Sequence, residues 1–430
     1  MQNERSLFRT LRRMQSPRST SRWDRRTVTA ARSFLMMAGG SVYAAKGGGK
    51  GKPGGDDPQY MPSFVEYRVT WIDLPAEMGI RPELRDINRD GFAVGYFGTS
   101  DGAYRGLLAD TDGGVWDLND VFSDALLEFP GWRFHGAHQI NAAGQIAGIL
   151  VPNGELRSST APDVLIVSAD LYTDPPSITV VDRILDTGVN LIKDMNEAGD
   201  MVVRRSSEAG FWLSRAPYTD EPERIEGPVG AEDFTVGYLN GAGQVTMAAF
   251  FNERIYRNRK QYNETLVHHV ILREPDGSLL DLGYGPDSWW VSPISEDGVV
   301  YTASNGTDYN PSTEGIIHRW DATQGWQPIT QAKGALHAGV SKEAGNKGEL
   351  VIDVNSTGGD ERVYREGYGT YKLEVTSGLN GQADVDFYES TVSQRFLRGI
   401  SRREEVAEAG YICGSQWDTA FILTPVPIQP

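Results

Sequence analysis

The sequence predicts an all-β protein, a β-propeller of seven four-stranded blades whose ring is closed by an N-terminal strand joining the last blade. Three observations predict it. One short motif recurs along the 430 residues at intervals of 44 to 60 residues, each copy is followed by short strand-like runs, and a spare strand stands ahead of the first copy. Periods of this size are typical of stacked supersecondary units. Because the last copies are weak, six or eight blades remain the alternatives.

The repeated motif has an apolar residue, then Asn or Ser, then a turn that contains Gly. Clear copies include DINRDGFAVG at 86–95 and QINAAGQIAG at 139–148. We call the Asn or Ser of each copy its anchor; the anchors are Asn88, Asn141, Asn196, Asn240, Ser295, Ser341 and Ser401. Their spacings are 53, 55, 44, 55, 46 and 60 residues.

Each unit continues with a second and a third β-like run. Apolar pairs mark the second run, as in RGLLAD at 105–110 and AFILTP at 420–425. The third ends with Asp-Leu, as in VWDL at 115–118. Short strands between turn residues at this spacing indicate antiparallel sheets.

The ends of the chain complement one another. The seventh unit lacks its final strand, whereas VEYRVTWIDLP at 65–75 precedes the first repeat and carries the same Asp-Leu ending. Pairing the two would complete the last blade and remove two open sheet edges.

The motif, the Asp-Leu strand ends and the terminal run Ala420–Pro425 resemble the HAF-type extracellular repeat proteins of bacteria. The resemblance covers about residues 65–425 and implies export, a propeller-like fold and no established catalysis. Only Ala420-Phe421 approaches the His-Ala-Phe-Leu-Trp of the fullest family motif. The Val-Pro-Glu-Pro sorting signal of some members is replaced here by VPIQP at 426–430.

The first 63 residues differ from the rest in composition. Residues 1–45 join an Arg-rich segment to a short apolar stretch and a Val42-x-Ala44 site, which predicts an export signal. A basic disordered tail and an organelle transit peptide are the alternatives. Residues 46–63 are a Gly-, Lys- and Pro-rich linker, and residues 64–430 form a single propeller domain. We therefore expect a periplasmic or extracellular protein.

The charge is uneven along the chain. Residues 1–58 carry 12 basic and 4 acidic residues, which leaves 29 basic and 54 acidic residues, a net charge of −25, for the remainder. So acidic a body repels nucleic acid. No apolar run reaches 18 residues, so the sequence predicts no membrane span. The single cysteine, Cys413, lies in an apolar run and is expected to be a buried thiol.

Asp86, Asn88 and Asp90 alternate as in the front half of a calcium loop. The twelfth position, where a carboxylate is needed, is Phe97, and the other copies keep only the Asn and the Gly. We interpret the motif as a turn. Calcium at these three residues is the alternative, and no other cofactor is expected.

The strongest binding hypothesis is positional. Three residues before each anchor stand Arg85, His138, Lys193, Gly237, Ser292, Ala338 and Arg398. In a closed ring the four basic members would be neighbours. We call Arg85, His138, Lys193 and Arg398 the cationic row, and expect it to bind an anionic ligand. The alternative is pairing with nearby acids such as Asp86 and Asp194.

Other residues carry weaker signals. His135 and His138 form an H-x-x-H pair, which we place in a loop before a strand rather than on a zinc-binding helix. Five tryptophans could stack against sugar rings, but we expect them to pack in the core. They are Trp132, Trp289, Trp290, Trp326 and Trp417.

These observations favour a secreted, non-catalytic propeller that binds an acidic glycan, a matrix component or a protein partner. One alternative is a propeller enzyme acting on polysaccharide, a glycosidase or lyase, which needs two carboxylates at the channel. The candidate acids are Asp86, Asp194, Glu296 and Asp297. The second alternative is a purely structural surface protein.

Overall fold

The computed structural model describes residues 64–426 except for several internal gaps. These gaps are 154–162, 186–190, 206–207, 259–260, 285–290, 304–315, 332–336, 345–348, 356–361, 366–368, 377–394, 401–409 and 417–418. The predicted export signal, the linker, the anchor Ser401 and three of the tryptophans, Trp289, Trp290 and Trp417, lie outside the described residues.

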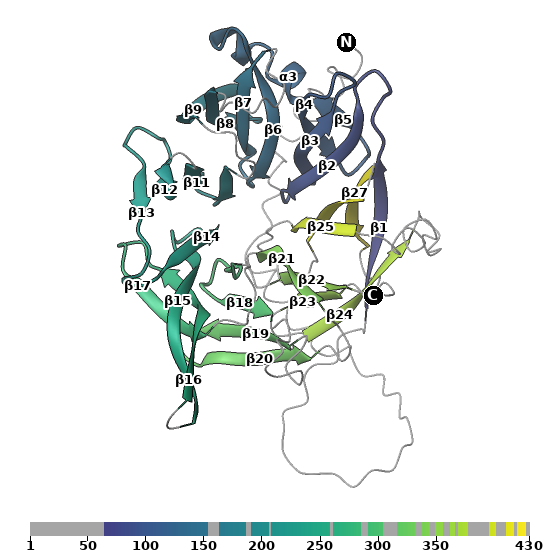
Figure 1. Cartoon of the computed structure of the whole chain (residues 1–430). Coiled ribbons are helices and arrows are strands. Elements are labelled where there is room, and N and C mark those ends of the chain that lie inside the picture. Colours follow the sequence, from purple (N-terminus) through teal and green to yellow (C-terminus); the bar gives the residue numbers. More distant parts are fainter. Residues whose placement is uncertain are drawn as a thin grey trace, which may run out of the picture. The chain divides into compact units, whose positions relative to one another are not determined.

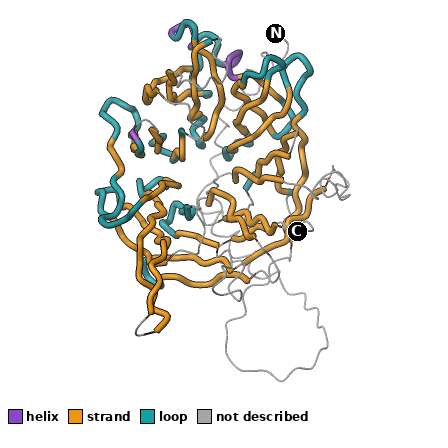
Figure 2. The backbone as a smooth tube through the Cα atoms, viewed as in Figure 1, coloured by secondary structure: helices purple, strands orange, loops and turns teal. Residues whose placement is uncertain are grey.

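The described chain is built almost entirely of strands (Figures 1 and 2). The first sheet contains β2 (Ile80–Ile87), β3 (Phe92–Gly98), β4 (Tyr104–Asp110) and β5 (Val115–Asp117), and the second contains β6 (Trp132–Ile140), β7 (Gln145–Pro152), β8 (Asp163–Asp170) and β9 (Ser177–Leu185). The third contains β10 (Ile192–Met195), β11 (Met201–Arg205), β12 (Gly210–Ser214) and β13 (Glu223–Ile225). The fourth contains β14 (Asp233–Leu239), β15 (Val245–Asn258), β16 (Gln261–Arg273) and β17 (Leu279–Tyr284).

The later strands are joined differently. A three-stranded sheet contains β18 (Val300–Ala303), β19 (Ile316–Asp321) and β20 (Gly325–Gln331). An eight-stranded sheet follows with β21 (His337–Ala344), β22 (Glu349–Asn355), β23 (Arg362–Arg365), β24 (Gly369–Thr376), β25 (Arg395–Ile400), β26 (Ile412–Gln416), β27 (Thr419–Pro425) and β1 (Phe64–Ile72). The helices described are α3 (Leu118–Val121) and the 3₁₀ turn η1 (Ala125–Glu128).

Strands in each four-stranded sheet follow chain order and pair antiparallel, as in propeller blades. This confirms the predicted all-β class and its four-stranded repeating sheets. The blade count and the closed ring stay predictions.

The N-terminal strand pairs as the sequence predicts. β1 runs antiparallel to β27, in a register from Tyr67 opposite Pro425 to Ile72 opposite Ala420 (Figure 1). Its other edge pairs in parallel with β24, from Phe64 opposite Lys372 to Arg68 opposite Thr376. That second pairing was not predicted, and it joins the last strands into one sheet.

Apolar clusters lie between consecutive sheets. One buries Met195 and Val203 of the third sheet with Ile149 and Ile166 of the second. Another joins Leu84 and Phe97 of the first sheet to Ile422 of β27. Because each sheet is apolar on both faces, its residues alternate between two such clusters, and neighbouring sheets hold one another in place. Cys413 is buried in one of them, as expected. Among the described residues no helix is long and apolar enough to cross a membrane.

Candidate ligand-binding site

Five of the anchors, Asn88, Asn141, Asn196, Asn240 and Ser295, close tight turns with the same backbone hydrogen bonds. In the third sheet the Asn196 N–H donates to the Asp200 carbonyl at 3.1 Å, and Gly199 N–H donates to the Asn196 carbonyl at 3.0 Å. Gly199 has a φ of 86°, which a side chain disfavours. The Asn196 Oδ1 accepts the N–H groups of Ala198 and Asp200 at 3.1 and 2.9 Å. The predicted turn role of the anchor is therefore confirmed.

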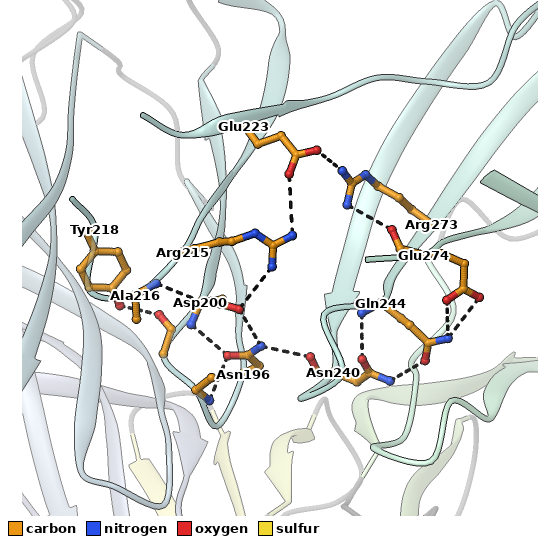
Figure 3. A network of polar contacts seen from close by, with 12 residues as sticks. Asn196, Asp200, Arg215, Ala216, Tyr218, Glu223, Asn240, Gln244, Arg273 and Glu274 are labelled. Carbon is orange, nitrogen blue, oxygen red and sulfur yellow. Dashed lines mark hydrogen bonds and ion pairs between the residues drawn. The ribbon is translucent and has the colours of Figure 1, made fainter. Parts of the chain in front are cut away.

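The anchors also bind one another across the sheets, which the sequence analysis missed. Asn88 Nδ2 donates to the Asn141 carbonyl at 3.3 Å, and Asn141 Nδ2 donates to the Asn196 carbonyl at 3.4 Å. Asn196 Nδ2 reaches the Asn240 carbonyl, and Asn240 Nδ2 the Ser295 carbonyl, both at 3.1 Å. We call this chain of bonds the asparagine relay. Figure 3 shows the step from Asn196 to Asn240.

Side chains around the relay satisfy the remaining amide hydrogens. Asn240 Nδ2 also donates to Gln244 Oε1 at 2.8 Å, and Gln244 in turn donates to Glu274 (Figure 3). Asn141 uses Gln145 in the same way at 2.8 Å. A buried amide with its donors and acceptors all engaged stabilises the junction that it spans.

Two carboxylates add a second link between sheets. Asp86 Oδ2 accepts the Ile140 N–H at 2.8 Å, and Asp194 Oδ2 accepts the Leu239 N–H at 2.7 Å. Both aspartates are buried. Each stands two residues before its own anchor and receives the N–H that directly precedes the next one. These two acids therefore fix the register between neighbouring first strands.

The three residues of the calcium alternative are occupied by protein donors. Asp86 accepts the Ile87 and Ile140 N–H groups. Asn88 Oδ1 accepts the Asp90 and Phe92 N–H groups, and Asp90 accepts the Tyr172 hydroxyl at 2.8 Å. Among the described residues no group of three or more His, Cys, Asp or Glu side chains is placed to hold a metal. The oxygens named in the calcium alternative thus accept hydrogen bonds within the turn and at the sheet junction.

Three members of the cationic row are each the extra residue of a β-bulge in the first strand of their sheet. Pairing of β2 with β3 shifts register between Leu84 and Asp86, so Arg85 is the extra residue. In the second sheet the register shifts between Ala137 and Gln139, so His138 is the extra residue. In the third sheet it shifts between Ile192 and Asp194, so Lys193 is the extra residue. A β-bulge redirects the side chain of its extra residue and is common beside functional sites. The relay holds these bulges on neighbouring first strands.

Arg85 is held by residues of its own sheet. Its guanidinium lies 3.0 Å from Glu83 Oε1, donates to the Tyr96 hydroxyl at 2.9 Å and lies 5.2 Å from the centre of the Tyr96 ring. The alternative of pairing with a nearby acid therefore holds for Arg85, with Glu83 rather than Asp86 as the acid. Tyr96 donates to Glu83, and burial is the largest cause that raises the Tyr96 pKa. Arg85 Nε is buried and has no hydrogen-bond partner among the described residues.

His138 and His135 both lie within β6, so the expectation that this pair sits in a loop is wrong. The β-bulge at His138 lets strand β6 continue through this residue, although the turn residues nearby in the sequence suggested that His138 lies outside a strand. Burial, then the charge of Arg85, then His135 lower the His138 pKa to about 3. The imidazole is therefore neutral at neutral pH. His135 is in edge contact with the Tyr104 ring at 5.6 Å.

Lys193 lies on β10 with its ammonium 5.8 Å from the centre of the Phe211 ring. Burial is the main cause that lowers the Lys193 pKa, and the positive Arg204 adds to it. Among the described residues no acid is paired with Lys193. Asp194, which the alternative named as a possible partner, accepts the Leu239 N–H instead. Arg398 lies in β25 at a shift between Leu397 and Gly399. Its side chain lies outside the described residues.

The other candidate residues have structural environments. Trp326 donates to the Leu282 carbonyl at 2.6 Å and packs against a core cluster, as expected of a core tryptophan. Glu296 accepts the Gly241 N–H, so it too links two sheets. Asp297 is exposed on the next position of that turn. Trp132 begins β6 and is half-buried.

Comparisons with known proteins add little beyond the fold. No protein family and no curated protein matches the sequence. Among solved structures the chain is similar to virginiamycin B lyase from Staphylococcus aureus, with 10% identity, a TM-score of 0.44 and coverage of 84% of this chain and 100% of that one. It is also similar to TolB from Acinetobacter baumannii, with 14% identity, a TM-score of 0.37 and coverage of 78% and 80%. Such low similarities assign no activity or ligand to this chain.

Proposed function

We propose that this protein is an exported, non-catalytic β-propeller of the HAF type that binds an acidic ligand, a glycan before a protein, through the cationic row. In this proposal seven blades form a ring closed by β1. The observation that carries it is the placement of Arg85, His138 and Lys193 as the bulged residues of three consecutive first strands.

The charges around the row support this proposal. The chain has a net charge of −17, yet burial and then the positive charge of Arg85 lower the pKa of His138, and burial and then the positive charge of Arg204 lower the pKa of Lys193. His138 is neutral at neutral pH, so the cations among these three are Arg85 and Lys193, and partial removal from water in the field of Arg204 raises the free energy of the charged Lys193. A bound carboxylate, sulfate or phosphate group would lower it and would offer Arg85 a second charge-assisted bond beside Glu83.

The fate of the candidate acids favours binding over polysaccharide cleavage. Asp86, Asp194 and Glu296 each accept a backbone N–H from a neighbouring sheet. Acids held in this way fix the fold and are poorly placed to exchange protons with a substrate. We therefore assign the anionic-ligand role to the row and no catalytic role to these three acids.

The test measures, by isothermal titration calorimetry, the binding of the full chain to polygalacturonate, heparin and neutral dextran. Lys193→Met keeps a long unbranched side chain at this position and removes the charge that lies over the Phe211 ring. Arg183→Ala is the matched control, because it removes a positive charge from the exposed Arg183–Asp163 pair. The basic residues 1–58 contribute equally to all variants. We expect Lys193→Met to weaken binding to the acidic polymers and the control to leave it unchanged. Equal binding by both variants would refute the proposal.

A further inference from the structure

We infer that two copies of this chain associate by pairing one open edge of strand β15 antiparallel to the same edge of the second copy. The inference goes beyond the proposed function, because it concerns the fourth sheet and uses no member of the cationic row. An open strand edge is a template on which another strand can add. The length of β15, the direction of its backbone groups and the order of its charges support this pairing.

β15 and β16 extend beyond the strands that flank them in their sheet. β14 pairs with β15 only as far as Phe250, which lies opposite Asp233, whereas β15 and β16 stay paired as far as Asn258. We call residues 251–258 of β15 and 261–268 of β16 the ribbon, and Figure 1 shows it extending past β14 and β17. Among the described residues no strand pairs with the β14 side of β15 within the ribbon. This edge is therefore open.

The backbone groups that face the open edge can be identified. The Phe250 carbonyl accepts the Glu232 N–H at 2.8 Å, so it faces the β14 side. Because backbone groups alternate in direction along a strand, the N–H and C=O groups of Asn252, Arg254 and Tyr256 face that side as well. The register shift that follows Tyr256 ends this regular stretch. A second strand laid along the edge would pair with these groups.

The order of the charges selects one register of self-pairing. Charged residues on an edge usually prevent pairing, because like charges then come opposite one another. In a two-fold antiparallel pair one residue lies opposite its own copy, and a centre at Glu253 or Arg254 would bring like charges together. A centre at Ile255 brings only an apolar residue opposite itself.

The same centre matches the residues on both sides of Ile255. It places Arg254 opposite Tyr256 of the second copy, which is a cation and an aromatic ring. It also places Glu253 opposite Arg257 of the second copy, which are unlike charges. By symmetry each of these pairs occurs twice. The segment ERIYR, residues 253–257, is therefore self-complementary about its central isoleucine.

The ribbon also keeps the two acidic bodies apart. The chain after residue 58 carries a net charge of −25, so two copies repel one another at close range. Ile255 stands five residues beyond Phe250, and a strand rises about 3.4 Å per residue, so the centre lies about 17 Å from the end of β14. Antiparallel pairing directs the two bodies oppositely and separates these ends by about 34 Å. Because the Debye length is about 8 Å at physiological ionic strength, this repulsion is largely screened.

Sedimentation velocity of the full chain, without any ligand and up to about 100 μM, tests the inference, since so short an interface forms only a weak dimer. Arg257→Glu and Glu253→Arg each bring like charges opposite one another at both symmetric positions. The double variant exchanges the charges and restores unlike pairs. Arg183→Glu is the matched control, because it makes the same charge change at an exposed residue of the second sheet. Arg254→Pro removes an N–H that faces the open edge and none that faces β16.

We expect the wild-type chain and the Arg183→Glu control to dimerise alike as the concentration rises. Arg257→Glu should raise the dissociation constant about tenfold, because two pairs change from attraction to repulsion, and the double variant should recover most of the loss. Amide hydrogen exchange at Asn252 and Arg254 should slow with concentration, whereas exchange at Phe251, which faces β16, should not change.

A chain that stays monomeric over the whole concentration range would overturn the inference. So would a dimer that Arg257→Glu and Arg254→Pro leave at the wild-type dissociation constant, because another surface would then form it. Failure of the double variant to recover would rule out pairing about Ile255. None of these results bears on the acidic ligand, so the proposed function is tested separately.

Discussion

The Asn196 side chain donates a hydrogen bond to the backbone carbonyl of Asn240, 3.1 Å away on the next sheet. The same bond recurs from Asn88 to Asn141, from Asn141 to Asn196 and from Asn240 to Ser295. At Ser295 the side chain changes to a hydroxyl, whose Oγ accepts the Val299 N–H at 3.1 Å. A serine can close its own turn in this way, but it is too short to copy the amide's second bond.

Replacing Asn196 by serine should therefore separate its two roles. Asn196→Ser keeps an acceptor for the Asp200 N–H and loses the donor to Asn240, so we expect a loss of about 1 kcal/mol in the free energy of unfolding. Asn196→Ala also leaves two turn N–H groups without their acceptor and should cost about 2 kcal/mol or more. Urea unfolding measures both. Wild-type stability in the serine variant would show that the inter-sheet bond contributes nothing.

Gly199 should tolerate alanine less well than another glycine of similar backbone conformation. Gly199 and Gly102 have φ values of 86° and 80°. A Cβ on Gly199 would lie 2.7 Å from Gln145 Oε1 of the preceding sheet, whereas nothing lies within 4 Å of one on Gly102. Both variants incur the left-handed cost of about 1–2 kcal/mol, and Gly199→Ala adds the steric conflict.

Thermal melts of the two alanine variants test this. The Gly199→Ala variant should melt at a lower temperature than Gly102→Ala, and a further Gln145→Ala change should reduce the difference. Equal melting temperatures for Gly199→Ala and Gly102→Ala would mean that the turn moves freely away from the neighbouring sheet.

Stability should depend on the titration of His138. Its pKa is about 3 in the folded protein, below the value of 6.5 of a free histidine. Between these two values the unfolded chain binds a proton that the folded chain does not, so the stabilisation is present above about pH 6.5 and is lost as the pH falls towards 3. His138→Gln removes this contribution. We expect the loss of unfolding free energy between pH 7 and pH 5 to be smaller in that variant.

The imidazole can also be followed directly. An NMR titration of the folded protein should show His138 still neutral at pH 5. A midpoint near 6.5 would mean that the ring is solvated and lies outside the field of Arg85.

Calcium should leave the melting temperature unchanged. An ion at the first anchor turn would have to displace the Ile140 N–H from Asp86 and the Tyr172 hydroxyl from Asp90. We expect melts in calcium and in EDTA to coincide. A calcium-dependent increase that Asp90→Asn abolishes would instead restore the metal hypothesis for Asp86, Asn88 and Asp90.

The local pattern of the sequence was enough for the sheets and the turns. Alternating runs such as FAVGYF at 92–97 became strands, and the Asp-Leu ending of the first strand correctly suggested its pairing with β27. The turn role of the anchors followed from their Asn and Gly residues. The strands and turns depend on residues within a few positions of one another, whereas the pairing of β1 with β27 joins the two ends of the chain and was inferred from the spare strand at one end and the missing strand at the other.

The contacts between sheets could not be predicted from local sequence patterns. The partner of Asn88 lies 53 residues away and is a carbonyl oxygen, which every residue possesses and no pattern marks. The bulges at Arg85 and His138 depend on the register between two strands, and the partner of Arg85, Glu83, is set by the same irregularity. Composition therefore identified the cations, and only the structure gave their surroundings.

The relay's acceptors are main-chain atoms, and this has an evolutionary consequence. An asparagine that binds the next anchor's carbonyl needs no particular side chain at that acceptor, and the residues after the anchors differ between units, being Arg89, Ala142, Glu197 and Gly241. A duplicated unit would carry its own connector and would need no matching change in the unit beside it. Such a chain can lengthen or exchange repeats by recombination while the junctions assemble themselves.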